Sequence, residues 1–229
     1  MSADWILVIP VKGTAGAKSR LGGDPEHRSA LAQAIAVDSV AAASAATAVA
    51  RLVVVTDSAV APIFEALGAE VVVDAGNGLN AAVRQGIQYA QSSPHGQTNG
   101  AQRIAILLGD VPALQPEELS AALDAAAAHT LAVVPDADGD GSVLITATAG
   151  AEHHPSFGAD SFAAHSDAGY VALTVPANSG LRRDVDTLDQ LRALDPTCVG
   201  PRTALLLDSV GGSNGVSGQL AAGVTIAHP

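Results

Sequence analysis

Two acidic segments in this sequence have the residue types and spacing to hold a hard cation. Asp110 closely follows an apolar run, Ile104 to Leu108, that is typical of a buried strand. Asp184 and Asp186 stand one residue apart in the segment LRRDVDT (181–187). Mg²⁺ usually takes one or two protein carboxylates and fills its other positions with water and phosphate oxygens. We therefore expect either a metal site built from Asp110 and one partner, or a turn cap at Asp110.

The partner of Asp110 can be sought in two places. The turn DADGDG (136–141) carries three aspartates, but Ala147 stands where a calcium-binding loop needs its closing glutamate. The segment LRRDVDT is more informative, because a helix N-cap needs only one of its polar side chains. Its surplus of charge indicates a site. Beside the strand-end carboxylate, Gly109 is expected to let a ligand approach the backbone.

A glycine-rich loop after the first predicted strand holds both lysines of the chain. The loop KGTAGAKSRLGGDP (12–25) contains four glycines together with Lys12, Lys18 and Arg20. It lacks the dinucleotide pattern GxGxxG, and Ala17 replaces the glycine that GxxxxGK[ST] requires before the lysine. Because glycines permit close approach and lysines concentrate positive charge, we predict phosphate binding here. A solvated loop with incidental lysines is the alternative.

The elements that must position these residues alternate between strand and helix over the first 130 residues. This pattern predicts an α/β fold whose mainly parallel sheet has helices on both faces and an added antiparallel edge. Ligands of such sheets bind beyond the carboxyl ends of the strands. The expected strands span 5–11, 52–57, 70–74, 103–110, 130–136, 142–149 and 170–176, and the expected helices 28–47, 62–68, 79–91, 115–129, 157–170 and 186–194.

Composition and charge narrow the class of protein. The 229 residues are 48% hydrophobic and 3% aromatic, and we expect one domain, 1–208, with a Gly/Ser-rich tail, 209–229. The net charge of −12 argues against nucleic-acid and anionic-membrane binding. No apolar run approaches the roughly 18 residues of a membrane span, and no signal peptide is expected. A single cysteine, Cys198, fits a reducing, cytoplasmic setting.

The sequence lacks the motifs of zinc-dependent and serine-nucleophile catalysis. It contains no HExxH pattern, no Cys/His cluster and no GxSxG elbow. Zinc catalysis and serine-hydrolase chemistry are therefore disfavoured. We expect a reaction without a covalent protein nucleophile.

Taken together, the motifs resemble the nucleotidyltransferases of coenzyme F420 biosynthesis, the 2-phospho-L-lactate or phosphoenolpyruvate guanylyltransferase family. The resemblance covers about residues 5–207, with several short motifs in the same order. These motifs are IPVKGTAGAKSRL (9–21), VVVTD (53–57), GNGLNAAVRQG (76–86), LLGDVPAL (107–114), PDADGDGSVLI (135–145), FGADSF (157–162) and LRRDVDT (181–187).

The resemblance implies a fold, a metal and a set of site residues. The implied fold is a GT-A-like, Rossmann-like three-layer sandwich, and the implied metal is Mg²⁺ bound by Asp110 and Asp186. The implied catalytic residues are Lys12, Lys18, Arg20, Asp110 and Asp186. The nucleotide would lie at Gly13, Lys18, Asn77, Gly78 and Asn80, and the acid at Ser142, Gly158 and Ser161.

The implied reaction transfers GMP from GTP to a phosphorylated three-carbon acid and releases pyrophosphate. The alanine-rich, lysine-poor composition is typical of a high-GC organism, and bacterial members of the family are associated with phosphoenolpyruvate, so we expect this acceptor. The alternatives are 2-phospho-L-lactate or 3-phospho-D-glycerate, another small-molecule nucleotidyltransferase reaction, or a non-catalytic binding module. The implied downstream partner is a transferase that adds the deazaflavin.

Overall fold

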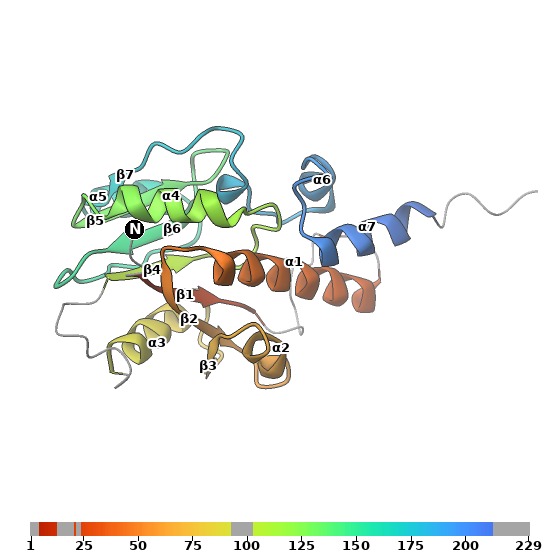
Figure 1. Cartoon of the computed structure of the whole chain (residues 1–229), viewed down its shortest axis with the longest axis horizontal. Coiled ribbons are helices and arrows are strands. Elements are labelled where there is room, and N and C mark those ends of the chain that lie inside the picture. Colours follow the sequence, from red (N-terminus) through yellow and green to blue (C-terminus); the bar gives the residue numbers. More distant parts are fainter. Residues whose placement is uncertain (1–4, 13–20, 22–23, 93–102, 213–229) are drawn as a thin grey trace, which may run out of the picture.

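The computed structural model describes residues 5–12, 21, 24–92 and 103–212 of the 229-residue chain. The strands in these ranges are β1 (Trp5–Pro10), β2 (Val49–Thr56), β3 (Glu70–Val73), β4 (Arg103–Leu107), β5 (Leu131–Pro135), β6 (Ser142–Ala147) and β7 (Val171–Ala172). They form a seven-stranded sheet in the order β3-β2-β1-β4-β6-β5-β7 (Figure 1).

Helices cover both faces of this sheet. They are α1 (Pro25–Ala45), α2 (Ala61–Glu65), α3 (Leu79–Ser92), α4 (Pro116–Ala126), α5 (Ser161–Asp167), α6 (Leu188–Arg192) and α7 (Pro201–Gly212), with the 3₁₀ helix η3 (Gly180–Arg182). Helices α1 and α4 lie over one face and α3 over the other, which gives the predicted three-layer α/β sandwich (Figure 1). No helix in the described ranges combines the length and apolar character needed to cross a bilayer.

The sheet is mixed, and its one reversed strand lies inside it. Strands β3, β2, β1 and β4 run parallel to one another. Strand β6 pairs antiparallel with both β4 and β5, whereas β5 and β7 are parallel. The predicted antiparallel strand therefore exists, but it is not at an edge as expected. Because β6 runs against the others, its first residue, Ser142, lies where the parallel strands end.

The central strand β1 is buried on both faces, which explains its continuous apolar sequence. Alternate side chains point to opposite faces of a strand. Trp5, Leu7 and Ile9 accordingly join a core cluster that includes residues of α1 and α4. Ile6 and Val8 join a second cluster that includes residues of α3. The two faces of the sheet are thus both closed by apolar packing.

Two helix starts follow signals that the sequence carries. Asp24 caps α1, since its carboxylate accepts a hydrogen bond from the backbone N–H of His27 at 2.9 Å, and Pro25 follows in the first turn. Gln115 and Glu118 form a capping box at the start of α4. These starts set where each helix leaves the strand-end loops.

The last helix, α7, was not among the predicted elements. It packs beside α1, where Leu31 and Ile35 of α1 share a third apolar cluster with Leu191 of α6. The buried Asp38 of α1 accepts hydrogen bonds from the backbone N–H groups of Arg202 (3.3 Å) and Thr203 (2.7 Å). Its carboxylate therefore caps the N-terminal turn of α7.

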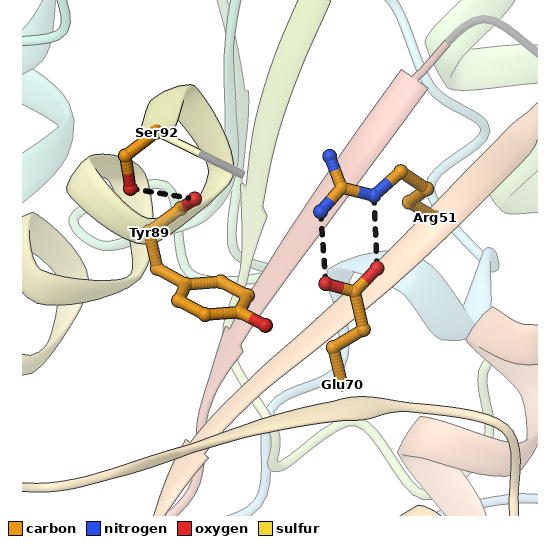
Figure 2. A network of polar contacts seen from close by, with 4 residues as sticks. All are labelled: Arg51, Glu70, Tyr89 and Ser92. Carbon is orange, nitrogen blue, oxygen red and sulfur yellow. Dashed lines mark hydrogen bonds and ion pairs between the residues drawn. The ribbon is translucent and has the colours of Figure 1, made fainter. Parts of the chain in front are cut away.

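A polar network fastens the edge strand β3 to its neighbour (Figure 2). Arg51 on β2 donates two hydrogen bonds to the carboxylate of Glu70 on β3, at 2.9 and 2.8 Å. Such a paired arrangement is the strong form of an ion pair. Burial and the neighbouring Glu70 carboxylate raise the pKa of Tyr89 on α3. The network thus joins three elements at the end of the sheet opposite β7.

Two predicted elements are much shorter than expected. The helix expected over 157–170 is α5, Ser161–Asp167, because Gly158 (φ 137°) and Asp160 (φ 55°) before it have non-helical backbone angles. Gly169 (φ 91°) follows its end. The strand expected over 170–176 pairs only at Val171–Ala172.

Candidate active site

A cavity of about 750 Å³ opens at the edge of the sheet where the parallel strands end. Its described wall comes from the ends of β1 and β4, the start of β6, the loop before α5 and the segment 184–186. The sequence analysis placed the ligand at this edge. Six predicted site residues line the cavity together: Lys12, Asp110, Ser142, Gly158, Ser161 and Asp186.

Asp110 reaches the cavity through a tightly packed turn after β4. Gly109 is needed for this packing, because a Cβ there would meet Val11 Cγ2 at 3.1 Å and Ile9 Cγ2 at 3.2 Å. Its missing side chain makes room for the end of β1, and Gly109 also lines the cavity, where the sequence predicted that it lets a ligand approach the backbone. The backbone carbonyl of Asp110 accepts a hydrogen bond from Val185 N–H at 2.9 Å. This bond brings segments about 75 residues apart to one wall of the cavity.

Asp186 lies just before α6, but it does not cap that helix. Thr187 is the N-cap, and its Oγ1 accepts from the backbone N–H of Gln190 at 3.2 Å. The side chain of Gln190 in turn accepts from the backbone N–H of Asp186 at 2.9 Å. The cap therefore does not use the Asp186 carboxylate, and Asp186 lines the cavity. This agrees with the interpretation that LRRDVDT carries more polar groups than a cap requires.

Asp184 is a third carboxylate in the same wall. Its burial, followed by the negative charges of Asp110, Asp136 and Asp186, raises its pKa from 3.8 to about 7. Burial is the larger cause of this rise, and the nearby negative charges add to it. The donor set is therefore all oxygen, anionic and crowded, which fits a hard divalent cation such as Mg²⁺.

No three His, Cys, Asp or Glu side chains within the described ranges converge tightly enough to hold a metal by themselves. Mg²⁺ does not need such a cage, because water and substrate phosphate commonly complete its octahedron. Asp110 and Asp186, with Asp184 beside them, are the residues of this chain that would hold it.

The side chain of Asp136 organises the turn 136–141. Its Oδ1 accepts from the backbone N–H groups of Gly139 (2.6 Å) and Asp140 (3.2 Å), and its Oδ2 from that of Gly141 (2.8 Å). Arg182 donates to the backbone carbonyls of Pro135 and Asp136, with the shortest bond at 2.6 Å. The first arginine of LRRDVDT therefore ties its segment to the end of β5.

Hydroxyl groups form another part of the cavity wall. The backbone N–H of Ser142, the first residue of β6, donates to Ser161 Oγ at 2.9 Å. His165, one turn along α5 from Ser161, places its Nδ1 2.9 Å from Ser142 Oγ. The φ of Gly158 (137°) lies in a region that side-chain-bearing residues rarely adopt. A substitution at Gly158 would strain the loop that leads into these hydroxyls.

A second, partly buried histidine has a ring that is held by two hydrogen bonds. His153 Nε2 lies 3.0 Å from the backbone carbonyl of Ile104, and its Nδ1 lies 3.2 Å from the hydroxyl of Tyr170. Since a carbonyl only accepts, Nε2 carries the hydrogen and Nδ1 accepts from Tyr170. Burial lowers the pKa of both His153 and His165 from 6.5 to about 4. Both rings are therefore neutral at pH 7.

The predicted nucleotide-binding residues divide into three groups. Lys12 lines the large cavity and also a smaller one of about 290 Å³, which Gly78 lines too. Asn77 is exposed on the turn between Gly76 and Gly78 and is not among the described lining residues of either cavity. The other three predicted site residues in the glycine-rich loop, Gly13, Lys18 and Arg20, lie outside the described residues.

Asn80 has a role that the sequence did not reveal. Its side-chain amide donates to the backbone carbonyl of Phe157 at 2.9 Å and accepts from the N–H of the same residue at 2.8 Å. It thereby holds the loop before α5 against α3. His165 is the residue of this wall that sequence reasoning missed, and its role also depends on tertiary packing. Only the four-residue spacing between Ser161 and His165 could have placed His165 on the same helix face.

Comparison with known proteins agrees with this geometry. Residues 5–172 match the protein family described as "Guanylyl transferase CofC like". The chain belongs to this family. It is 43% identical to the phosphoenolpyruvate guanylyltransferase of Sanguibacter keddieii, over 89% of this chain and 84% of that protein. It is 46% identical to the enzyme of the same name from Streptomyces coelicolor, over 87% of this chain and 94% of that protein.

Solved structures support the fold. A protein from Desulfovibrio desulfuricans that is assigned to the nucleotide-diphospho-sugar transferases superposes with a TM-score of 0.68. The match covers 92% of this chain and 96% of that one at 20% sequence identity. At this identity the likeness concerns the fold alone, and it agrees with the GT-A-like architecture expected from the motifs.

Proposed function

We propose that this member of the family is a Mg²⁺-dependent guanylyltransferase that transfers GMP from GTP to phosphoenolpyruvate in coenzyme F420 biosynthesis. The relatives named above carry this activity in their names, and the chain covers most of their length. The structural observation that carries the proposal is one cavity that combines Asp110, Asp184 and Asp186 with Lys12 and with the hydroxyls of Ser142 and Ser161.

The reaction joins two anions, and this decides what the residues must do. A phosphate oxygen of phosphoenolpyruvate attacks the α-phosphorus of GTP, the bond to the pyrophosphate oxygen breaks, and enolpyruvyl-diphospho-5′-guanosine and pyrophosphate result. The attacking oxygen is already anionic, so no general base is required. Catalysis then consists of alignment and charge neutralisation. The absence of a serine or cysteine nucleophile from the motifs follows from this chemistry.

Each part of the cavity has a task in this mechanism. Lys12, at the end of β1, neutralises phosphate oxygens, and we propose the same for Lys18 and Arg20 of the glycine-rich loop. Ser142 and Ser161 hold the acid by hydrogen bonds. Asp110 and Asp186 would hold Mg²⁺, which when bound stabilises charge on the transferring phosphoryl group and on pyrophosphate.

The smaller cavity is the proposed place of the nucleoside. It adjoins the large one, because Lys12 and Leu79 line both. Gly78 in its wall belongs to the motif that the resemblance assigned to the nucleotide. The diphosphate product would pass to a partner transferase that adds the deazaflavin.

A panel of nucleotides and acceptors tests the proposal. Protein, Mg²⁺ and GTP are incubated with phosphoenolpyruvate, 2-phospho-L-lactate or 3-phospho-D-glycerate, and pyrophosphate release is measured with the partner transferase present to trap the product. We expect the highest kcat/KM with GTP and phosphoenolpyruvate. A higher value with another acid would reassign the acceptor, and no release with any acid would refute the proposed function. ATP, CTP and a sugar phosphate serve as control substrates.

A further inference from the structure

His165 has its tautomer fixed by two hydrogen bonds. Its Nε2 lies 3.0 Å from the backbone N–H of Ser156, and its Nδ1 lies 2.9 Å from Ser142 Oγ. A backbone amide can only donate, so Nε2 of the neutral ring carries the lone pair and Nδ1 carries the hydrogen. The ring therefore donates to the hydroxyl oxygen of Ser142.

The surroundings of His165 keep the imidazole ring uncharged and fix its orientation. The side chain is fully buried, and its ring packs edge-on against Phe157 and Tyr170, with centroid distances of 5.1 and 5.2 Å. Burial lowers the pKa of the imidazole to about 4. Protonation of Nε2 would also bring a hydrogen against the N–H of Ser156. At neutral pH the ring is therefore a fixed donor.

This arrangement determines where the serine hydrogens point. Ser142 Oγ accepts from His165, and Ser161 Oγ accepts from the backbone N–H of Ser142 at 2.9 Å. Among the residues that the structure describes, neither hydroxyl hydrogen has an acceptor within hydrogen-bonding distance. Both serines line the large cavity. The two O–H groups are thus available to donate to a ligand there.

We infer that His165 is a positioning residue for the acid acceptor, and that by donating to Ser142 it directs the Ser142 hydroxyl hydrogen toward the acceptor's carboxylate, beside the Ser161 hydroxyl. The inference rests on the proposed function. The carboxylate is the group of the acid that fits this position, because the phosphate must approach GTP near Lys12 and the aspartates. Two neutral donors bind an anion without adding charge to the cavity.

Substitutions test whether His165 acts through Ser142. His165→Leu removes the donor, and we expect the KM for phosphoenolpyruvate to rise at least about tenfold while the KM for GTP stays within about twofold. His165→Asn can place an amide N–H near the position of Nδ1, and it should recover most of the loss. If His165 acts through Ser142, the double variant Ser142→Ala/His165→Leu should be no worse than Ser142→Ala alone. Multiplying effects in the double variant, or equal changes in both KM values, would overturn the inference.

Two measurements on the full-length wild-type protein do not depend on turnover. Nitrogen-15 NMR of the histidine rings at pH 7.5 should show a neutral ring for His165 with hydrogen on Nδ1, assigned by its loss in His165→Asn. Titration with phosphoenolpyruvate alone should give weaker binding for His165→Leu than for the wild type. A ring protonated on Nε2, or equal binding by the two proteins, would overturn the inference. An inactive wild type that passes both measurements would instead refute the proposed reaction.

Discussion

Asp110 and Asp186 come from distant parts of the sequence and meet in one cavity wall. The bond between Val185 N–H and the Asp110 carbonyl, 2.9 Å long, fixes this meeting at the level of the backbone. The two side chains can therefore change without loss of the link that joins their segments. This separates their proposed chemical role from their place in the fold.

The first prediction follows from that separation. Asp110→Asn or Asp186→Asn should lower kcat for pyrophosphate release by roughly 100-fold or more, because each change removes an anionic ligand of the proposed Mg²⁺ site. The melting temperature should stay close to that of the wild type. Asp138→Asn is the matched control, since this exposed aspartate is not among the described lining residues of the cavity. Equal losses in the control would refute the assignment.

The second prediction concerns Asp184 and pH. Its folded-state pKa is raised from 3.8 to about 7, so the protein loses stability as the pH rises through this window. Asp184→Asn cannot ionise and should raise the free energy of unfolding by on the order of 1–3 kcal/mol at pH 8 without metal. The gain should shrink as the pH falls toward 4. Urea unfolding in EDTA measures it, and a gain that is equal at pH 5 and pH 8 would contradict this account.

Residue types that end strands could be predicted as site residues from the sequence. Asp110, Lys12 and Ser142 each border an apolar run, and the cavity contains all three. His165 could not be found in this way, and the raised pKa of Asp184, which the sequence named beside Asp186, was not predictable either, because both depend on neighbours that other segments bring to them. Asn80 was predicted from its motif as a nucleotide-binding residue, and the structure shows that its side-chain amide holds the backbone of Phe157.

At the scale of elements, the side chain of Arg182 links η3 to the end of β5 by hydrogen bonds. Arg182→Ala removes its bonds to the carbonyls at the end of β5, which should cost about 1–3 kcal/mol of stability and loosen the segment that carries Asp184 and Asp186. We expect a lower kcat as well. The neighbouring Arg183→Ala is the control, because Arg183 donates to the Ala177 carbonyl only at 3.5 Å. Urea unfolding and initial rates would show whether the two arginines differ.

His153 joins the end of the sheet to the segment before α5, and it should make stability depend on pH. Its pKa is lowered from 6.5 to about 4 in the folded protein, so the unfolded chain takes up the proton first. Stability is then complete above pH 6.5 and falls as the pH drops toward 4. His153→Gln should lose stability at pH 8 but show a flatter decline in acid.

The difference between wild type and His153→Gln isolates this histidine. His165 contributes with the same sign, whereas Asp184 contributes with the opposite sign, and both remain in the variant. We expect the two unfolding curves, measured in urea from pH 4.5 to 8, to converge by roughly 1–3 kcal/mol as the pH falls. Parallel curves would show that His153 titrates normally in the folded protein.

The elements themselves were largely predictable, and their ends were less so. Alternating apolar runs and helical periodicity indicated β1 to β4 and α1 to α4, because buried strands and helices with one apolar face leave clear patterns. Helix α7 was missed because its sequence leads into the Gly/Ser-rich tail. It continues to Gly212, past the expected boundary at residue 208. The contact with Asp38 of α1 that stabilises α7 could not be predicted from the sequence of α7 itself.

At the scale of the molecule, Asp38 connects α1 to the C-terminal helix. Asp38→Ala should cost about 1–2 kcal/mol or more, because it leaves the buried N–H of Thr203 and the partly buried N–H of Arg202 without their acceptor. Asp24→Ala, at the exposed N-cap of α1, should cost less, since the bond that it accepts from the N–H of His27 at 2.9 Å is exposed to solvent. Thermal unfolding of both variants compares two aspartate caps that differ mainly in burial. A larger loss in Asp24→Ala would contradict the proposed docking.

The order of strands could not be read from the sequence. Apolar runs show that a strand is buried, but the runs of β4, β5 and β6 are similar, and none of them states its neighbour or its direction. Pairing is decided by which surfaces fit when the helices pack on both faces. The sequence therefore supported a mainly parallel sheet, whereas the place of the reversed strand between β4 and β5 required the structure.

The reversed direction of β6 changes the polarity of the site. The forward strands β1 and β4 bring Lys12 and Asp110 to this edge, where we propose that Mg²⁺ binds. Strand β6 instead starts at the edge with an amide, and the N–H of Ser142 passes its hydrogen bond to Ser161 Oγ. The sheet thus offers an electron-rich half suited to metal and a hydrogen-donating half suited to a carboxylate. In the proposed reaction, the acid has a phosphate at one end and a carboxylate at the other. The inverted strand gives each of these two anionic groups a matching partner.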